Sequence, residues 1–179
     1  MPDLTPLWIS IKVGFISTII VSILGIFICR TLYKRKGHAT QFLESLILLP
    51  IVLPPTVLGF ILIIVFSPRT FVGQFFQNVL HLPVVFTMTG AVIASVIVSF
   101  PLMYQHTIQG FRSINPKMLN TARTMGASER KIFYRLILPL SKRSIIAGIM
   151  MSFARAIGEF GATLMVAGYI RSEERRVGK

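Results

Sequence analysis

Acidic residues are scarce in this chain. Only six of its 179 residues are Asp or Glu, against nineteen Lys and Arg, and charged residues of both signs make up 14%. A soluble domain has about a quarter of its residues charged. This composition, with 53% hydrophobic residues and a mean hydropathy of +0.71, excludes an ordinary soluble fold. It predicts an all-α integral membrane protein.

The formal net charge of +13 could instead indicate a nucleic-acid-binding protein. However, the basic residues gather at the ends of apolar runs, which is the pattern that orients membrane proteins. We therefore expect contact with membrane lipid and no nucleic acid partner.

Residues that could perform chemistry are also few. Cys29 is the only cysteine, which excludes a disulfide framework and a cysteine metal site. Three scattered histidines, His38, His81 and His106, do not suggest a metal site either. The chain has no phosphate-binding Gly-x-x-x-x-Gly-Lys-Ser/Thr motif, and no nucleophile stands beside a base. We expect no catalytic residue, metal or cofactor, and any ATP hydrolysis must come from another protein.

Long apolar runs dominate what is present. A membrane-crossing helix needs roughly 20 apolar residues, and four segments qualify: residues 8–29, 42–66, 84–103 and 144–170. They predict a polytopic helical bundle over residues 1–170. A cleavable signal peptide is the alternative for the first run, but that run lacks a basic start and a small-residue cleavage site.

The second predicted span contains Pro50, Pro54 and Pro55, followed by Thr56. Proline removes a backbone donor and disrupts regular helix geometry, so we expect a broken or kinked span. Such breaks are tolerated where neighbouring helices or a water-filled cavity satisfy the freed carbonyls. The residues alone favour a packing kink, and a break that lines a transport pathway is the alternative.

Basic residues in the loops predict the orientation. The loop between the first two spans and the loop 105–143 are strongly basic, whereas the loop between the second and third spans contains only Arg69. The positive-inside rule then places both basic loops in the cytoplasm and the N-terminus outside. The basic residues are Arg30, Lys34, Arg35 and Lys36 in the first loop, and Arg112, Lys117, Arg123, Arg130, Lys131, Arg135, Lys142 and Arg143 in the other.

Residues 171–179 break this pattern, because a segment that should emerge outside carries four basic residues. A misplaced stop, an assembly error or a cloning scar explains this tail better than function does. We set it apart from the functional interpretation.

The loop 105–143 predicts two short helices. Asn115 can cap the first and Pro116 can begin it, so a helix is expected over about residues 117–125. Gly126 can end this helix in the left-handed conformation, and Ser128 can cap the next one. That second helix carries apolar residues at helical spacing and ends at Pro139.

Two interpretations of this loop follow from the residues alone. One is an amphipathic segment lying on anionic lipid, which the positive charge favours. The other is a helix-turn-helix, because the spacing of Ala122, Gly126 and Ser128 resembles that motif. A loop of 39 residues tethered between two spans could hardly dock on duplex DNA.

The loop sequence also carries a family pattern. Residues 120–126, NTARTMG, are followed after nine residues by LILP at 136–139, and this resembles the EAA coupling loop of ABC-importer permeases. Asn120 and Thr121 stand where that loop has Glu and Ala. The resemblance implies that coupling to an ATPase rests on Asn120, Thr121, Ala122, Arg123, Gly126, Ala127, Leu138 and Pro139.

Two further segments resemble the molybdate/sulfate class of these permeases. They are residues 49–59, LPIVLPPTVLG, and residues 153–168, FARAIGEFGATLMVAG, the second being similar to the molybdate branch. The resemblance covers roughly residues 8–170. Members of this family continue into at least one more helix, so the chain resembles a truncated permease.

The resemblance implies a mechanism and a set of partners. The chain would form half of a translocation pathway that works by alternating access in the prokaryotic inner membrane. Its partners would be two copies of an ABC ATPase subunit, a second permease copy and an external oxyanion-binding protein, with molybdate as the favoured cargo.

The fourth predicted span holds two charges, Arg155 and Glu159, at a spacing that lets them pair on one helix face. Either Arg155 meets the oxyanion, or Glu159 neutralises it in a structural ion pair, which is the favoured alternative. The residues expected at the pathway or subunit interface are Pro54, Pro55, Thr56, Arg155, Gly158, Glu159, Gly161 and Thr163. A competing function is a channel or scaffold that works without ATP and binds anionic lipid through its basic loop.

Overall fold

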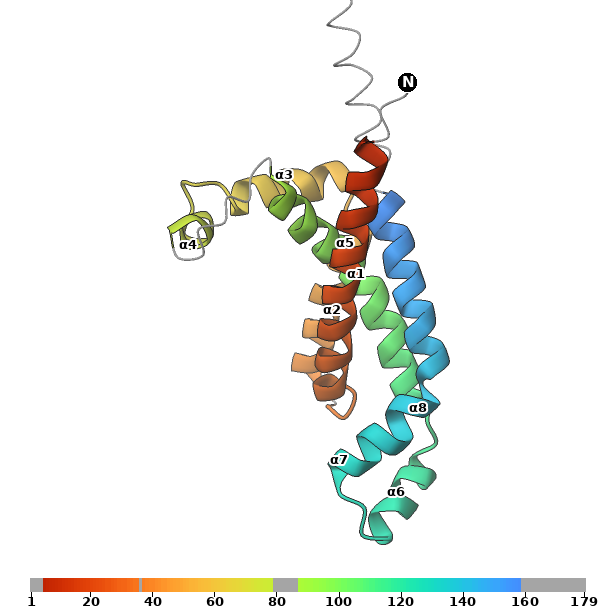
Figure 1. Ribbon diagram of the computed structural model, residues 1–179. Helices are drawn as coiled ribbons and strands as arrows, with labels where there is room; N and C mark the ends of the chain where they lie inside the picture. Colours follow the sequence, from red (N-terminus) through yellow and green to blue (C-terminus); the bar gives the residue numbers. More distant parts are fainter. Residues whose placement is uncertain (1–4, 36, 79–86, 159–179) are drawn as a thin grey trace, which may run out of the picture.

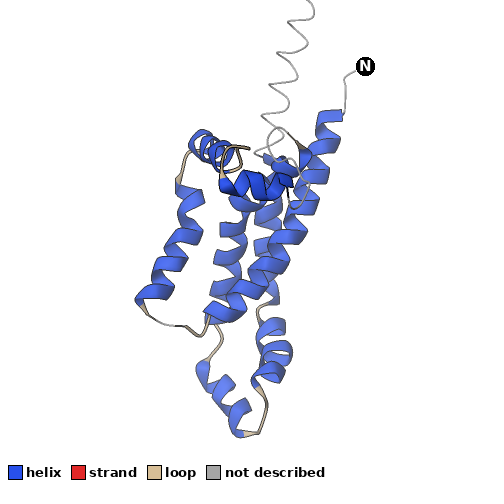
Figure 2. Cartoon of the chain, turned by 90° about the vertical axis from the view of Figure 1, so that its left-hand side faces the viewer, coloured by secondary structure: helices blue, strands red, loops and turns tan. Residues whose placement is uncertain are grey.

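The computed structural model describes residues 5–35, 37–78 and 87–158, and this part of the chain is helical without strands. Long helices stand side by side, and a smaller helical unit projects from one end of them (Figures 1 and 2). The first long helix is α1, Thr5–Leu32, and the second is α5, Met88–Arg112. The all-α membrane architecture predicted from the sequence is confirmed.

Both helices are long enough to cross a membrane. The apolar part of α1, Leu7–Leu32, has 26 residues, and α5 has 25. At a rise of about 1.5 Å per residue, each exceeds the hydrocarbon thickness of roughly 30 Å. The predicted span 8–29 lies within α1. The span predicted over 84–103 differs from α5, which continues to Arg112, so the first residues assigned to the loop 105–143 are helical.

The predicted break in the second span lies between α2, His38–Val52, and α3, Pro55–Val65. Each proline disfavours helical backbone in the residue before it, and Leu53 and Pro54 are accordingly extended, with ψ of 136° and 140°. The two helices meet at 116°. The favoured packing kink is thus replaced by a sharp turn, and α3 crosses the end of the bundle remote from the projecting unit (Figure 1). Helix α4, Phe71–Asn78, follows α3.

The last described helix, Lys142–Gly158, packs beside α5 and carries the first part of the span predicted over 144–170. Small residues allow close approach here. A Cβ at Gly110 of α5 would lie 2.6 Å from Ser144 Cβ, and one at Gly14 of α1 would lie 2.9 Å from Ile157 Cγ1. Close backbone packing of this kind holds membrane helices together where no hydrophobic driving force acts between them.

Buried hydroxyl groups join the same three helices. Ser95 of α5 donates to Ser17 Oγ of α1 at 2.9 Å. Ser152 of the last helix donates to the carbonyl of Ser99 on α5 at 3.2 Å. All four serines are buried, so each hydroxyl is satisfied within the bundle rather than by solvent.

Candidate coupling site

The unit that projects from the bundle, here called the polar tip, comprises residues 116–140. It contains α6, Pro116–Thr124, then α7, Glu129–Ile132, a π-helical turn, Phe133–Ile137, and α8, Leu138–Leu140. Helix α6 is the first arm of the tip, and Glu129–Leu140 is the second arm. A bend of 66° separates the second arm from the helix Lys142–Gly158. Figure 1 shows the tip at the end of the bundle opposite to α3.

The start of α6 agrees with the sequence prediction. Asn115 Oδ1 accepts a hydrogen bond from the backbone N–H of Lys117 at 2.9 Å, and Pro116 occupies the first helical position. A free N–H is not needed there, and the ring fixes a helical φ. The predicted cap and helix start are confirmed.

The turn between the two arms depends on Gly126, whose φ of 78° lies in the left-handed region. The N–H of Gly126 donates to the carbonyl of Arg123, and that of Ala127 donates to the carbonyl of Ala122, each at 3.0 Å. These two bonds form the Schellman arrangement that ends a helix. Ser128 Oγ then accepts from the N–H of Lys131 at 3.4 Å and caps α7. The predicted helix stop and second cap are both present.

Apolar side chains attach the second arm to the bundle. Ile132, Phe133 and Ile137 are buried. The ring of Phe133 stands edge-on to Phe111 of α5 at 5.7 Å, and Phe111 contacts Tyr33 at 5.8 Å in the same manner. This aromatic ladder, Tyr33–Phe111–Phe133, connects the end of α1, the end of α5 and the tip, and edge-to-face pairs of this kind are favourable.

Arg30, near the end of α1, also contacts the second arm. Its guanidinium lies 4.7 Å from the centre of the Phe133 ring, and its Nη1 donates to Tyr134 Oη at 3.2 Å. Stacking of arginine on an aromatic face is a cation–π contact. The tip is therefore held by α1 as well as by α5.

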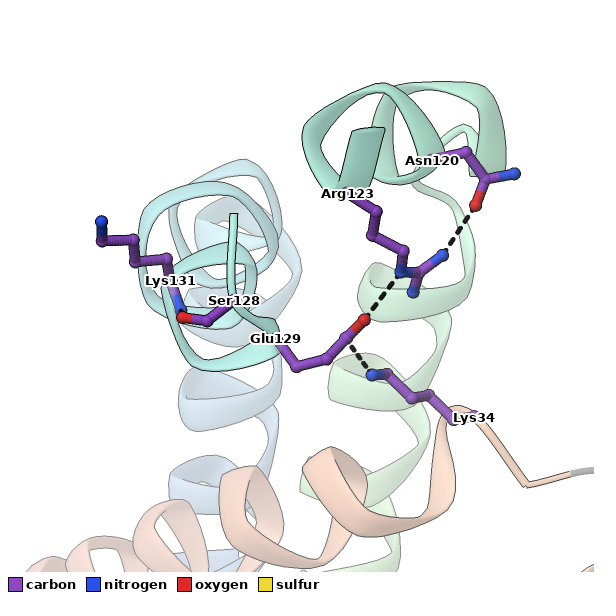
Figure 3. Close-up of polar contacts among 6 residues, drawn as sticks. All are labelled: Lys34, Asn120, Arg123, Ser128, Glu129 and Lys131. Carbon is purple, nitrogen blue, oxygen red and sulfur yellow. Dashed lines mark hydrogen bonds and ion pairs between the residues drawn. The ribbon is translucent and has the colours of Figure 1, made fainter. Parts of the chain in front are cut away.

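A chain of polar contacts crosses the tip (Figure 3). Glu129 at the start of α7 forms an ion pair with Lys34, which follows α1, and a second ion pair with Arg123 of α6, at 2.7 Å. Arg123 Nη1 also donates to Asn120 Oδ1 at 2.7 Å. Hydrogen bonds from Arg123 and then from Lys34 lower the pKa of Glu129 from its ordinary 4.5 to about 2, because both stabilise the carboxylate.

A further ion pair lies at the base of the bundle. Arg112, the last residue of α5, pairs through both terminal nitrogens with the carboxylate of Glu44 on α2, the second contact being 3.3 Å. A bidentate pair of this kind fixes orientation as well as distance. It joins α2 to α5 beside the point where the tip begins.

The eight residues expected to couple to an ATPase divide into two groups. Asn120, Thr121, Arg123, Gly126 and Pro139 are exposed on the tip. The other three, Ala122, Ala127 and Leu138, are half-buried and pack against the apolar core. The first group exposes the side chains of Asn120, Thr121, Arg123 and Pro139 and the backbone of Gly126, whereas the second group packs beneath them.

The residues expected at a pathway or interface lie elsewhere. Pro54 and Thr56 are exposed at the turn into α3, and Arg155 and Gly158 are exposed on the last helix. Pro55 begins α3. Glu159, Gly161 and Thr163 lie outside the described residues, as do residues 171–179. The Arg155–Glu159 pair therefore stays a prediction.

An open groove of about 270 Å³ lies between α1, α2 and α5. Its lining is apolar, and a desolvated oxyanion requires hydrogen-bond donors or positive charge, so this groove is not suited to an oxyanion. It is lined by Leu24, Ile28, Leu46, Ile47, Pro50, Val96, Ile97 and Phe100.

Sequence reasoning missed the roles of Arg30, Lys34 and Glu129. In the sequence, Arg30 of α1 and Lys34 just after α1 indicate only the orientation in the membrane. A clue was available, because Glu129 is the single acid among the basic residues of the loop 105–143. A lone carboxylate in such a setting will form ion pairs with its neighbours, although the sequence does not say which ones.

Comparison with known proteins decides the family. Residues 22–173 match the model of the binding-protein-dependent transport system inner membrane component. The chain belongs to this family. It is accordingly a multi-pass membrane protein of the prokaryotic inner membrane, and members of the family are transport subunits rather than enzymes. Membership implies an ATPase and a substrate-binding protein as partners.

Individual relatives agree with this assignment. The putative molybdenum transport system permease protein YvgM of Bacillus subtilis is 44% identical over 166 residues, which is 93% of this chain and 73% of the relative. The molybdenum transport system permease protein ModB of Escherichia coli is 32% identical over 176 residues, 98% of this chain and 77% of the relative. The probable transport system permease protein NifC of Clostridium pasteurianum is 32% identical over 146 residues, 81% of this chain and 50% of the relative.

Proposed function

We propose that this permease subunit carries molybdate across the inner membrane, driven by a separate ATPase. The polar tip is the observation that carries the proposal. It is a capped helix of nine residues presented on a glycine turn at the end of a tightly packed bundle. Relatives named as molybdenum transport permeases support the choice of cargo.

In this mechanism the tip faces the cytoplasm and the N-terminus lies outside. Asn120, Thr121 and Arg123 on the exposed face of α6 meet the ATPase, while Ala122, Ala127 and Leu138 seat the tip on the bundle. Two ATPase subunits close on ATP and move the tips of two permease copies. The pathway between the copies then opens outward to receive the oxyanion from the binding protein.

The break between α2 and α3 and the exposed Arg155 are assigned to the pathway or the interface between copies. Pro54 and Pro55 lack backbone N–H groups and so leave carbonyls that a watery pathway can satisfy, and the exposed Thr56 follows them. Arg155 lies on a membrane helix, where a charge costs about 2.5–3.5 kcal/mol on insertion scales, so it faces the pathway or a partner helix rather than lipid. Gly158, Glu159, Gly161 and Thr163 are assigned to the pathway or the interface as well in this proposal.

The competing function is a channel or scaffold whose tip binds anionic lipid without any ATPase. Exposed basic residues on the tip, such as Lys117, Arg130 and Lys131, are the observation in its favour. The N-caps and the glycine turn favour the ATPase instead, because a lipid surface does not require a helix held at a fixed position.

Co-purification of the tagged permease with its ATPase tests the proposal, comparing Gly126→Pro with Gly37→Pro. Both glycines have a positive φ, of 78° and 139°, and proline excludes positive φ. Only Gly126 lies in the tip. We expect Gly126→Pro to abolish ATPase recovery while Gly37→Pro retains it. Recovery of the unaltered permease without any ATPase would favour the channel or scaffold.

Transport of the cargo needs a separate measurement. In proteoliposomes containing the permease, its ATPase and its binding protein, molybdate uptake should require ATP inside and should be displaced by excess molybdate more strongly than by sulfate. Uptake without ATP would contradict the ATPase-driven mechanism, and preference for sulfate would contradict the cargo.

A further inference from the structure

Helix α6 is attached to the rest of the protein by few contacts. Leu119 is the one residue of α6 that is buried. A short connection, 113–115, links α6 to α5, and the turn at Gly126 links it to α7. A helix held in this way at both ends can pivot about its apolar anchor unless a further contact fixes its direction.

The chain from Lys34 through Glu129 and Arg123 to Asn120 supplies such a contact (Figure 3). It connects α6 to the start of α7 and both of them to the end of α1. Lys34 and Glu129 are 95 positions apart in the sequence, so this link is made only by folding. The carboxylate uses one oxygen for Lys34 and the other for Arg123.

We propose that Glu129 is a positioning residue that ties α6 to α1, so that α1 moves with the coupling segment when the ATPase closes. This inference rests on the proposed function, since it assumes that the exposed face of α6 meets an ATPase. Without this ion pair, a push on α6 would reach the bundle through the apolar contacts of Leu119 and Ala122 and through the flanking turns. With it, the push also reaches the end of the first membrane helix.

Two contacts of α1 make the connection directional. Lys34 holds the beginning of the second arm through Glu129, and Arg30 holds its middle by stacking on Phe133 and donating to Tyr134. Since Arg30 lies within α1 and Lys34 lies in the turn directly after it, the second arm is contacted at two points, one in α1 and one just beyond its end. The arm therefore cannot rotate about a single contact, and when it is displaced α1 moves with it.

Because the ion pair between Lys34 and Glu129 is exposed to solvent, we expect it to fix the position of α6 without adding much to the stability of the fold. The side chains of Lys34 and Glu129 are 43% and 51% exposed, and exposed ion pairs contribute little to folding. Variants of this link should therefore fold and should still bind the ATPase. What they should change is the amount of cargo carried for each ATP hydrolysed.

The test uses proteoliposomes that contain the permease, its ATPase and its binding protein, with molybdate uptake and ATP hydrolysis measured together. The variants are Glu129→Gln, Lys34→Met and the double substitution. Arg35→Met is the matched control, because Arg35 is an exposed basic residue beside Lys34 and is not part of the chain of contacts in Figure 3.

We expect uptake per ATP to fall about fivefold in each single variant, the size of effect that an exposed ion pair can have. The double variant should be no worse than the poorer single one, because both remove the same link. Arg35→Met should keep the ratio of the unaltered protein. Lys34→Arg, which retains the charge, should restore most of it.

Other results would overturn the inference. Effects of Lys34→Met and Glu129→Gln that add in the double variant would mean that the two residues act separately. An unchanged uptake per ATP in both single variants would mean that the link carries no motion. Loss of ATPase binding in Glu129→Gln would make Glu129 part of the ATPase contact instead. If the unaltered protein neither binds the ATPase nor takes up molybdate, the proposed function itself fails.

Discussion

Two regions of the protein, the helical bundle and the polar tip, are held together by different kinds of contact. In the bundle, α1, α5 and the last helix approach closely at glycine positions and are joined by hydrogen bonds of buried serines. Caps, a glycine turn, an aromatic ladder and solvent-exposed ion pairs hold the tip. The bundle contacts depend on shape and tolerate little change. The tip contacts are individually weak, so single substitutions there should cost less than substitutions in the bundle.

The largest difference should come from adding one methyl group to the bundle. At Gly110 the new Cβ would lie 2.6 Å from Ser144 Cβ, an atom that can move only with its backbone, so α5 and the last helix must separate. We expect Gly110→Ala to lower stability by about 1–3 kcal/mol, as overpacking does. The measurement is thermal unfolding of the purified permease in detergent.

Gly59→Ala is the control for this change. Gly59 lies inside α3, and nothing stands within 4 Å of its added Cβ. Alanine is favoured over glycine inside a helix by up to about 1 kcal/mol, so this variant should be unchanged or slightly more stable. Equal losses at both positions would show that close helix approach is not what holds the bundle.

An intermediate effect should come from removing a cap in the tip. Asn115→Ala leaves the N–H of Lys117 without its side-chain acceptor, and a lost N-cap costs about 1 kcal/mol. Hydrogen exchange should become faster for the amides of α6 and stay unchanged for those of α5. Asn115→Asp keeps an acceptor oxygen and should preserve protection. Faster exchange throughout α5 as well would mean that tip and bundle are not separate units.

A smaller effect is expected inside the bundle when one hydroxyl is removed. Ser95→Ala deletes the hydrogen bond to Ser17 between α5 and α1, and such interhelical bonds average about 0.6 kcal/mol in membrane proteins. Ser22→Ala is the control, because the Ser22 hydroxyl donates to the carbonyl of Thr18 within α1. Thermal unfolding should distinguish the two, and an equal loss would mean that the bond between helices adds nothing to stability.

The sequence predicted most of the local structure of the tip. Asn115, Pro116, Gly126 and Ser128 act through backbone groups within a few positions of themselves, so their roles follow from the order of residues. The break at Pro54 follows for the same reason. Its angle of 116° does not, because proline determines where a helix is interrupted but not the direction in which the next helix continues.

The contacts that attach the tip to α1 could not be predicted in this way. Lys34 and Glu129 meet only because α1 and the tip end at the same side of the bundle. The positive charge near the end of α1 is already explained by orientation in the membrane. The sequence therefore provides no separate reason to expect that Arg30 and Lys34 contact the tip. The extension of α5 to Arg112 was missed because its last two turns are polar, and hydropathy does not distinguish a helix leaving the membrane from a loop.

The smallest effect expected is a pH dependence confined to the tip. The pKa of Glu129 in the folded protein is about 2, below its ordinary value of 4.5. A lowered carboxyl pKa contributes stability above pH 4.5, and this contribution is lost as the pH falls through about 2. Hydrogen exchange of the α6 and α7 amides, corrected for intrinsic rates, should therefore accelerate between pH 4.5 and 2, while the α1 and α5 amides change less. Glu129→Gln should remove this dependence, because the amide does not titrate. If the pH dependence of exchange persisted in Glu129→Gln, another titrating group would be its cause. The response to acid would then no longer distinguish the tip from the bundle.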